Sequence, residues 1–384
     1  MDVGFETVGN ATLICHDGGP VLVTDPWLEG PAYFGSWTLS HRIPGEQLAA
    51  IQACPYVWIS HGHPDHLSGP SLERLKSKQL LVPDHVGVRI RDDLTAQGFN
   101  VAVLEDRQWY RLSPRLRVLC IADYNQDAVL LVELDGRLIA NLNDAGDRGW
   151  AGTVRRIIRG YPVAYLMALS GHGDADMMNF FREDGTRIPP DASLQAPVGS
   201  SIALRTEYFG ARYFIPFSSM HRYQRTDSDW ANAYVTTLDD YARGFASSRC
   251  ELLPAFVRVD FGRDEVVPLS PERNDAPLQP PEAFGDVWSD PLEADEVREV
   301  EQYFRAIEHL PKVMGFVNLR VGGRDNIVPL RAHGFGRGIT FEVPRGSLMT
   351  AVRYRVFDDL LIGNFMKTTM HGRWLRNRLT HDFS

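Results

Sequence analysis

The sequence predicts a mixed α/β protein in two parts, a large α/β unit followed by a smaller α+β unit. Short apolar runs that end in histidine or aspartate recur along residues 1–264, as expected for buried strands that deliver functional side chains. A proline-rich stretch, 265–290, resembles a linker. The tail, 291–384, begins with an acidic helix-like segment and continues with strand-like runs near 316–321, 338–343 and 351–356.

Composition narrows the class of protein. The chain has 384 residues, which is too long for one ordinary core but fits a large domain plus a smaller one. A net charge of −9 argues against a phosphate-backbone partner, so we expect no nucleic-acid binding. No apolar run approaches the length of a membrane span, and the N-terminus lacks the pattern of a signal peptide. We therefore expect no membrane association.

The four cysteines, at positions 15, 54, 120 and 250, are far apart and form no C-x-x-C pair. This spacing argues against a disulfide framework or a structural zinc ribbon, and it predicts a cytoplasmic protein. The chain also lacks the C-x-H and C-x-x-H pair of a Rieske iron–sulfur site.

A dense group of metal-binding side chains follows the strand-like run 56–59. Within six residues lie His61, His63, Asp65 and His66. His61 and His63 are two apart, so on an extended backbone both imidazoles point to one side. Pro64 forces a turn that presents the next two ligands from another direction. The spacing suits two adjacent metal ions, and a chance histidine-rich turn rarely has it.

Further candidate ligands stand at the ends of later strand-like runs. Asp144 ends the run 138–143 and is costly to bury there unless it is paired or bound to metal; the alternative is a helix N-cap. His221 follows the run 211–220 and is the candidate last ligand of the second metal, although a lone histidine there is more often structural. Asp25 is either a second-shell acceptor or an ordinary turn aspartate before proline.

A small polar loop supplies candidate groups for substrate chemistry. Gly171-His172-Gly173-Asp174-Ala175-Asp176 follows a core strand, and its imidazole and carboxylates make it a candidate substrate loop. A solvated polar turn is the competing interpretation. We take His172 and Asp174 as candidate catalytic residues, together with Asp65, which would orient an attacking hydroxide.

Several stretches occur in an order that resembles the metallo-β-lactamase superfamily. They are 25–32, 58–68, 127–133, Asn143-Asp144, 215–217 and 357–365. The resemblance implies an αββα sandwich with ligands on loops at one edge of the sheets. More narrowly, the chain is similar to the catalytic part of the CMP-N-acetylneuraminate hydroxylase family, without that family's Rieske domain.

This resemblance implies a specific ligand set. His61 and His63 would hold the first metal, Asp65 and His66 the second, and Asp144 would bridge, with His221 near the superfamily's last histidine. Asp123 stands where the family has a third histidine, four residues before Asp127. A carboxylate there makes the site harder and more anionic, which favours iron or manganese over zinc. Asp127 is an alternative ligand.

Two chemistries compete for this site. A di-iron oxygenase would hydroxylate or oxidise a small organic substrate with electrons from an external donor. A dinuclear hydrolase would activate a bridging water against an ester, lactone, amide or phosphodiester. The subgroup resemblance and Asp123 favour oxidation. A non-catalytic, metal-dependent scaffold is the weakest alternative, because the ligand set is nearly complete.

Overall fold

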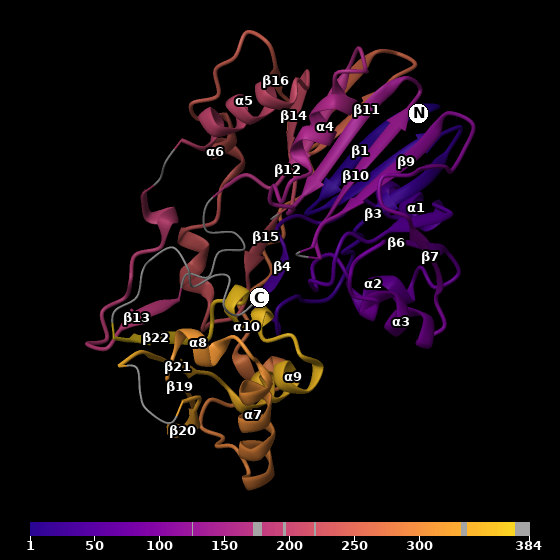
Figure 1. Cartoon of the computed structure of the whole chain (residues 1–384). Helices are drawn as coiled ribbons and strands as arrows, with labels where there is room; N and C mark the ends of the chain where they lie inside the picture. The colour runs from indigo at the N-terminus through magenta and orange to yellow at the C-terminus, as the bar shows by residue number, and fades with distance from the viewer. Residues whose placement is uncertain (125, 172–178, 195–196, 219, 332–335, 373–384) are drawn as a thin grey trace.

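The computed structural model describes residues 1–124, 126–171, 179–194, 197–218, 220–331 and 336–372. Two mixed β-sheets lie face to face in the upper part of Figure 1, and a smaller α+β unit lies at one end of them. None of the helices in the described part of the chain is long and apolar enough to cross a bilayer.

The first sheet combines an antiparallel half with a parallel half. Its strand order is β18-β17-β1-β2-β3-β5-β6-β7. The bounds are β1 (Val3–Gly9), β2 (Thr12–Asp17), β3 (Pro20–Thr24), β5 (Tyr56–Trp58), β6 (Gln79–Pro83), β7 (Asn100–Leu104), β17 (Val257–Asp260) and β18 (Glu265–Pro268). Strands β3, β5, β6 and β7 are parallel, so their carboxyl ends lie at one edge.

The second sheet has the order β16-β14-β12-β11-β10-β9-β8. Its strands are β8 (Trp109–Arg111), β9 (Leu116–Ala122), β10 (Ala128–Leu134), β11 (Arg137–Asn143), β12 (Ala164–Ala168), β14 (Tyr213–Pro216) and β16 (Glu251–Leu252). Apolar side chains of both sheets form one core, in which the rings of Phe5 and Tyr165 are 5.0 Å apart.

Helices cover the outer faces of both sheets. Apolar clusters pack α1 (Gly45–Ala53), α2 (Gly69–Glu73) and α3 (Arg89–Ala96) on the first sheet. The second sheet carries α4 (Ala151–Ile158), α5 (Val198–Phe209) and α6 (Leu238–Ala242). The layers are therefore helix, sheet, sheet, helix, which confirms the predicted αββα sandwich.

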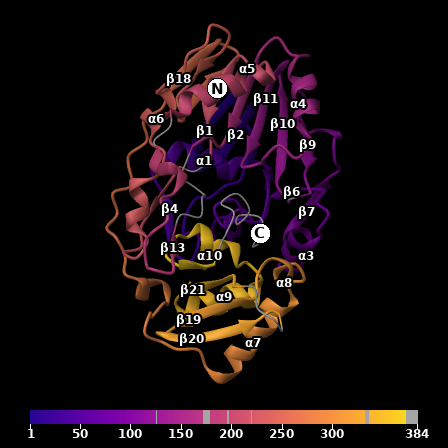
Figure 2. The same cartoon turned by 60° about the vertical axis from the view of Figure 1, so that its left-hand side comes forward.

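A third sheet forms the smaller unit, which apart from β13 is coloured orange to yellow in Figure 2. Its order is β13-β22-β21-β19-β20, from β13 (Phe180–Arg182), β19 (Phe316–Val321), β20 (Arg324–Pro329), β21 (Gly338–Glu342) and β22 (Lys367–His371). Its helices are α7 (Ala294–Ala306), α8 (Leu310–Val313), α9 (Arg345–Tyr354) and α10 (Asp358–Ile362). A small ribbon, β4 (Trp37–Leu39) with β15 (His221–Tyr223), lies between this unit and the sandwich.

Two local expectations differ from the structure. The run 351–356 was expected to be a strand, but it belongs largely to helix α9, because Leu348, Ala351 and Val352 repeat at helical spacing and are buried together. The segment 265–290 begins with strand β18, which pairs with β17 instead of leaving the sandwich as a linker. In addition, β13 from the predicted first domain joins the C-terminal sheet. The proposed domain limits otherwise stay a prediction.

Candidate metal centre

The candidate metal-binding side chains stand on loops that leave three strands at one edge of the sandwich. The loop after β3 carries Asp25, the loop after β5 carries the histidine-rich motif, and Asp144 follows β11. Because β3 and β5 are parallel neighbours, their ends deliver side chains to the same place. Hydrogen bonds between these loops then hold the three segments together.

His61 and His63 face each other, as their spacing predicts. The Nε2 atom of His61 lies 2.9 Å from the Nδ1 atom of His63. The other nitrogen of His61, Nδ1, contacts the Ser60 hydroxyl at 2.9 Å. Burial and the neighbouring imidazoles of His66 and His63 hold the pKa of His61 well below its usual range. A neutral imidazole is the form that binds metal.

His66 is fully buried at the centre of the candidate site. Its Nε2 atom is 3.3 Å from Oδ2 of Asp65 and 3.4 Å from Oδ2 of Asp144. That nitrogen has no well-aligned hydrogen bond within the described residues. Ligands of one tetrahedral ion with N and O bonds near 2.0–2.1 Å stand roughly 3.3 Å apart. The donor set and its spacing therefore fit a bound metal ion.

Two groups of donor atoms in this region could each hold a metal ion. One group that could hold an ion consists of His61, His66 and Asp144, and a second consists of His63, Asp358 and Asp359; in each, the ligand atoms lie within 4.8 Å of one another. Asp358 and Asp359 come from helix α10 of the C-terminal unit. We did not predict these two carboxylates as site residues, and the only signal in the sequence was an adjacent acidic pair inside the stretch 357–365.

Asp65 is held by hydrogen bonds to both of its oxygens. Tyr33 donates to Oδ1 at 2.6 Å, and Asn10 donates to Oδ2 at 3.0 Å. Burial alone would raise the pKa of Asp65, but the neighbouring His66 and these hydrogen bonds lower it. The carboxylate is thus kept ionised and fixed in orientation, as a metal ligand must be.

A network of polar side chains supports the Nδ1 side of His66. Asp25 Oδ2 lies 3.3 Å from His66 Nδ1, while its Oδ1 accepts a hydrogen bond of 2.7 Å from the Ser60 backbone N–H. Asn143 donates to Asp25 at 2.7 Å and to the Ser60 hydroxyl at 2.7 Å. Asp25 and Asn143 both have positive φ, 39° and 50°, a left-handed conformation that aspartate and asparagine adopt more readily than most other residues. Asp25 therefore contacts His66 directly and links it to Ser60 and Asn143, as expected of a residue that supports a ligand.

The carboxylates around the centre carry more negative charge than the nearby side chains neutralise. Burial, with the neighbouring Asp144 and Asp123, raises the pKa of Asp127 to about 6. Burial, with Asp358 and Asp65 nearby, raises the pKa of Asp359 to about 8. A pocket that destabilises ionised carboxylates in this way fits cations, which would supply the missing positive charge.

Asp123 and His221 are the remaining predicted ligands. Asp123 is buried at the end of β9, and its Oδ1 accepts a hydrogen bond of 3.2 Å from the Asp127 N–H. His221 opens β15, and its ring stacks on Trp37 with centroids 3.3 Å apart. Neither belongs to the two donor groups found among the described residues, so both assignments stay predictions. His172 and Asp174 lie outside the described residues.

A cavity of about 780 Å³ opens beside the metal centre. Its lining includes the candidate ligands and their acidic neighbours, namely His61, His63, Asp127, Asp144, Asp358 and Asp359. Apolar side chains from both units contribute to it, namely Leu67, Leu72, Ile90, Leu94, Phe99, Leu169, Val356 and Ile362, and Arg89 and Arg355 line the same cavity. A cavity of this volume that combines apolar walls with convergent polar groups is typical of a small-molecule site.

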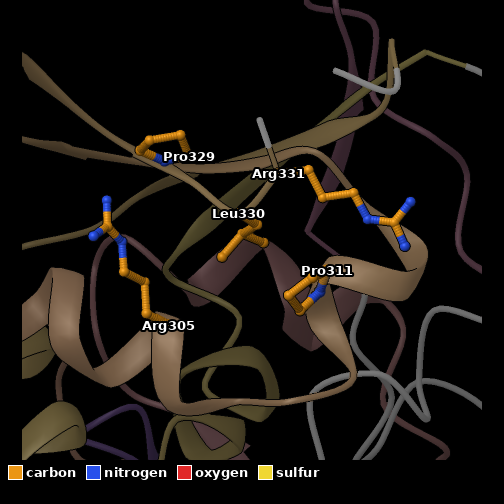
Figure 3. A pocket seen from close by; sticks show the side chains of 5 residues that line it. All are labelled: Arg305, Pro311, Pro329, Leu330 and Arg331. Carbon is orange, nitrogen blue, oxygen red and sulfur yellow. The ribbon is translucent and has the colours of Figure 1, made fainter. Parts of the chain in front are cut away.

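A second cavity, of about 440 Å³, lies in the C-terminal unit (Figure 3). Arg305 and Arg331 stand on opposite sides of Pro311, Pro329 and Leu330 there. The described residues that line it include neither a histidine nor a carboxylate. The cavity beside the histidines is therefore the candidate active site.

No family model matches this chain, but its sequence is similar to those of several curated proteins. It is 31% identical over 156 residues to cytidine monophosphate-N-acetylneuraminic acid hydroxylase of Macaca mulatta, covering 38% of this chain and 26% of that protein. The Danio rerio hydroxylase is 33% identical over 156 residues, with 38% and 26% covered. The matched part thus spans about a quarter of these relatives.

Solved structures with a similar arrangement are more distant. The diiron β-hydroxylase CmlA of Streptomyces venezuelae has a TM-score of 0.44 at 14% identity, covering 70% of this chain and 54% of that one. An isothiocyanate hydrolase from Delia radicum gut bacteria has a TM-score of 0.41 at 14% identity, covering 67% and 98%. The fold assignment therefore depends on the layers and strand order of the chain itself and on the sequence relationship.

Proposed function

We propose that this chain, which has the metallo-β-lactamase fold and is distantly related to the cytidine monophosphate-N-acetylneuraminic acid hydroxylases, is a di-iron oxygenase. The observation that carries the metal assignment is the fully buried His66 Nε2, placed 3.3 and 3.4 Å from the carboxylates of Asp65 and Asp144. Such a nitrogen, without a well-aligned hydrogen bond, is costly to bury unless an ion binds it.

Each ligand has a defined place in this proposal. His61 and His63 would hold one ion, Asp65 and His66 the other, and Asp144 would bridge, with Asp123 and His221 as further candidates. Two bound irons would supply the activation of molecular oxygen, using electrons from an external donor. An oxygen-rich donor set suits iron better than zinc.

The protein's own groups prepare the site for an organic substrate. Tyr33 and Asn10 fix Asp65, and Asp25 fixes His66, so the ligand geometry is set before a substrate binds. Apolar side chains in the cavity lining, including Phe99 and Ile362, would contact the apolar part of a substrate, and Arg89 and Arg355 line the same cavity. These features favour a small, partly apolar substrate.

Oxidation is preferred to hydrolysis because the sequence relationship is to hydroxylases. The carboxylate of Asp123 at the place of a histidine favours the same choice. The dinuclear hydrolase remains the alternative that the experiment must exclude, because the same ligands would also hold two ions that lower the pKa of a bound water.

The deciding experiment is metal analysis of tag-free protein produced in iron-replete medium, combined with optical spectra of the reduced protein before and after exposure to air. We expect two irons per chain and a spectrum that changes with oxygen. Two zinc ions without an oxygen response would overturn the oxygenase and direct the search to ester, lactone and phosphodiester substrates. His66→Ala should lose metal, whereas the control His309→Ala, in the C-terminal unit, should not.

A further inference from the structure

The two ring nitrogens of His63 have different neighbours. Its Nδ1 atom is 2.9 Å from His61 Nε2, on the side of the predicted metal. Its Nε2 atom is 3.4 Å from Oδ2 of Asp358, a residue 295 positions later in the chain. The imidazole therefore connects a ligand of the sandwich to a carboxylate of the C-terminal unit.

Several contacts fix this part of the C-terminal unit beside the metal loops. The Ser36 hydroxyl donates to the Gly363 carbonyl at 2.5 Å, and the Asn364 amide donates to the Tyr223 hydroxyl at 2.9 Å. On the other side, the Arg89 guanidinium donates to the backbone carbonyls of Tyr354 and Arg355 just before α10. Asp358 is thus held in place by contacts on both sides of it.

A neutral imidazole has one N–H, and only its other nitrogen can bind a metal ion. A carboxylate that accepts the N–H fixes the tautomer and the ring orientation and strengthens the metal bond. With Nδ1 directed at His61, the N–H of His63 would be on Nε2, where Asp358 stands. The geometry fits an outer carboxylate–histidine pair.

We propose that Asp358 is a positioning residue of the metal centre, which orients His63 so that Nδ1 faces the ion, and that the centre is incomplete without the C-terminal unit. This inference depends on the proposed metal binding. Asp358 acts through His63 and is not assigned as a ligand.

Asp93 provides a control carboxylate. It stands on helix α3 of the sandwich, lines the same cavity and makes no hydrogen bond with His63. Asp93→Asn removes a carboxylate from this cavity without removing the partner of His63. A comparison of Asp358→Asn with Asp93→Asn therefore tests whether metal binding depends on the contact with His63 or only on the number of carboxylates in the cavity.

The test measures the affinity for cobalt(II) by competition with a chelator, together with the visible absorption of the bound cobalt, in wild type, Asp358→Asn, Asp358→Glu and Asp93→Asn. We expect Asp358→Asn to weaken binding by about 10- to 100-fold and to change the spectrum. Asp358→Glu should restore most of the affinity, and Asp93→Asn should stay within about threefold of wild type. Circular dichroism of each variant checks that it is folded.

Three results would overturn the inference: unchanged affinity in Asp358→Asn, an equal loss in Asp93→Asn, or complete loss of one ion in both Asp358 variants, which would make Asp358 a direct ligand. If Asp358→Asn does not fold, Asp358→Ala takes its place in the same comparison with Asp93→Asn. A wild-type protein that binds no metal would refute the proposed function itself, whereas a metal-loaded wild type with an unaffected Asp358→Asn would refute only this inference.

Discussion

The hydroxyl of Tyr33 donates a hydrogen bond of 2.6 Å to Oδ1 of Asp65, and both side chains are buried. Tyr33 has a φ of 49°, a left-handed conformation that costs energy for a residue with a large side chain. Its ring packs edge-on against Trp37 with centroids 4.5 Å apart. The loop before β4 is therefore held in a strained conformation in which the Tyr33 hydroxyl contacts Asp65, a predicted metal ligand.

Removal of the Tyr33 hydroxyl should weaken metal binding. In Tyr33→Phe, Asp65 keeps its contact with Asn10 but loses one of two orienting hydrogen bonds, so we expect the affinity for metal to fall by about tenfold. Chelator competition measures the change. Tyr208→Phe, which removes an exposed hydroxyl on α5, should have no effect. Equal affinity in Tyr33→Phe and wild type would show that Asn10 alone positions Asp65.

The sequence was informative where function depends on local spacing. The pattern of His61, His63, Asp65 and His66 could be recognised because alternation on a strand and a proline turn are local properties. The apolar runs before these residues predicted the strands in the same way. The carboxylate of Asp144, at the end of β11, was found for the same reason, and it lies 3.4 Å from His66.

Contacts made across long sequence separations could not be predicted in this way. Asp358 meets His63 only after the C-terminal unit docks on the sandwich, and Asn10 reaches Asp65 only through the packing of β1 and β2 against the metal loop. Strand β13 joins a sheet whose other strands lie more than a hundred residues later. No local periodicity encodes such pairings, because they are set by the tertiary arrangement.

A buried arginine takes part in a polar network that connects the sandwich to the C-terminal unit, and its removal should destabilise the protein. Arg225 is fully buried, lies 2.8 Å from both Asp227 and Asp286, and donates to the Phe34 carbonyl at 2.7 Å. Asp286 in turn accepts hydrogen bonds from the backbone N–H and the hydroxyl of Ser347 on α9, at 2.8 and 2.6 Å. Arg225→Met would leave the buried Asp286 without its cation. We expect the free energy of unfolding to fall by about 3–5 kcal/mol in urea denaturation.

An exposed ion pair provides the control for that variant. Arg212→Met removes a surface contact with Glu251 and should cost less than about 1 kcal/mol. If both arginine variants lose equally little, the buried network around Arg225 does not contribute to the stability of the docked arrangement.

The acid stability of the sandwich should depend on Glu6. Burial would raise its pKa, but hydrogen bonds with His16, Arg258 and Gln47 outweigh it and lower the pKa from 4.5 to about 2. A carboxylate with a depressed pKa in the folded state contributes stability that is present above about pH 4.5 and is lost as the pH falls towards 2.

We therefore expect Glu6→Gln to lower the free energy of unfolding at neutral pH by about 1.5–3 kcal/mol, since hydrogen bonds to a charged group are lost. The deficit should shrink as the pH falls, because wild type then loses the same contribution. Urea denaturation over a pH series measures both effects, with the exposed Glu265→Gln as control. A deficit that is constant with pH would exclude the ionised carboxylate as its cause.

Metal selectivity should depend on Asp123, which is buried at the end of β9 near the centre. Replacement of this carboxylate by an imidazole makes the donor set softer, so Asp123→His should increase the zinc-to-iron ratio of protein loaded from an equimolar mixture. Elemental analysis measures the ratio. Asp127→His tests the alternative ligand, and Asp106→His, before β8, is the control. An unchanged ratio in Asp123→His would remove Asp123 from the ligand set, and a shift confined to Asp127→His would transfer the role to that residue.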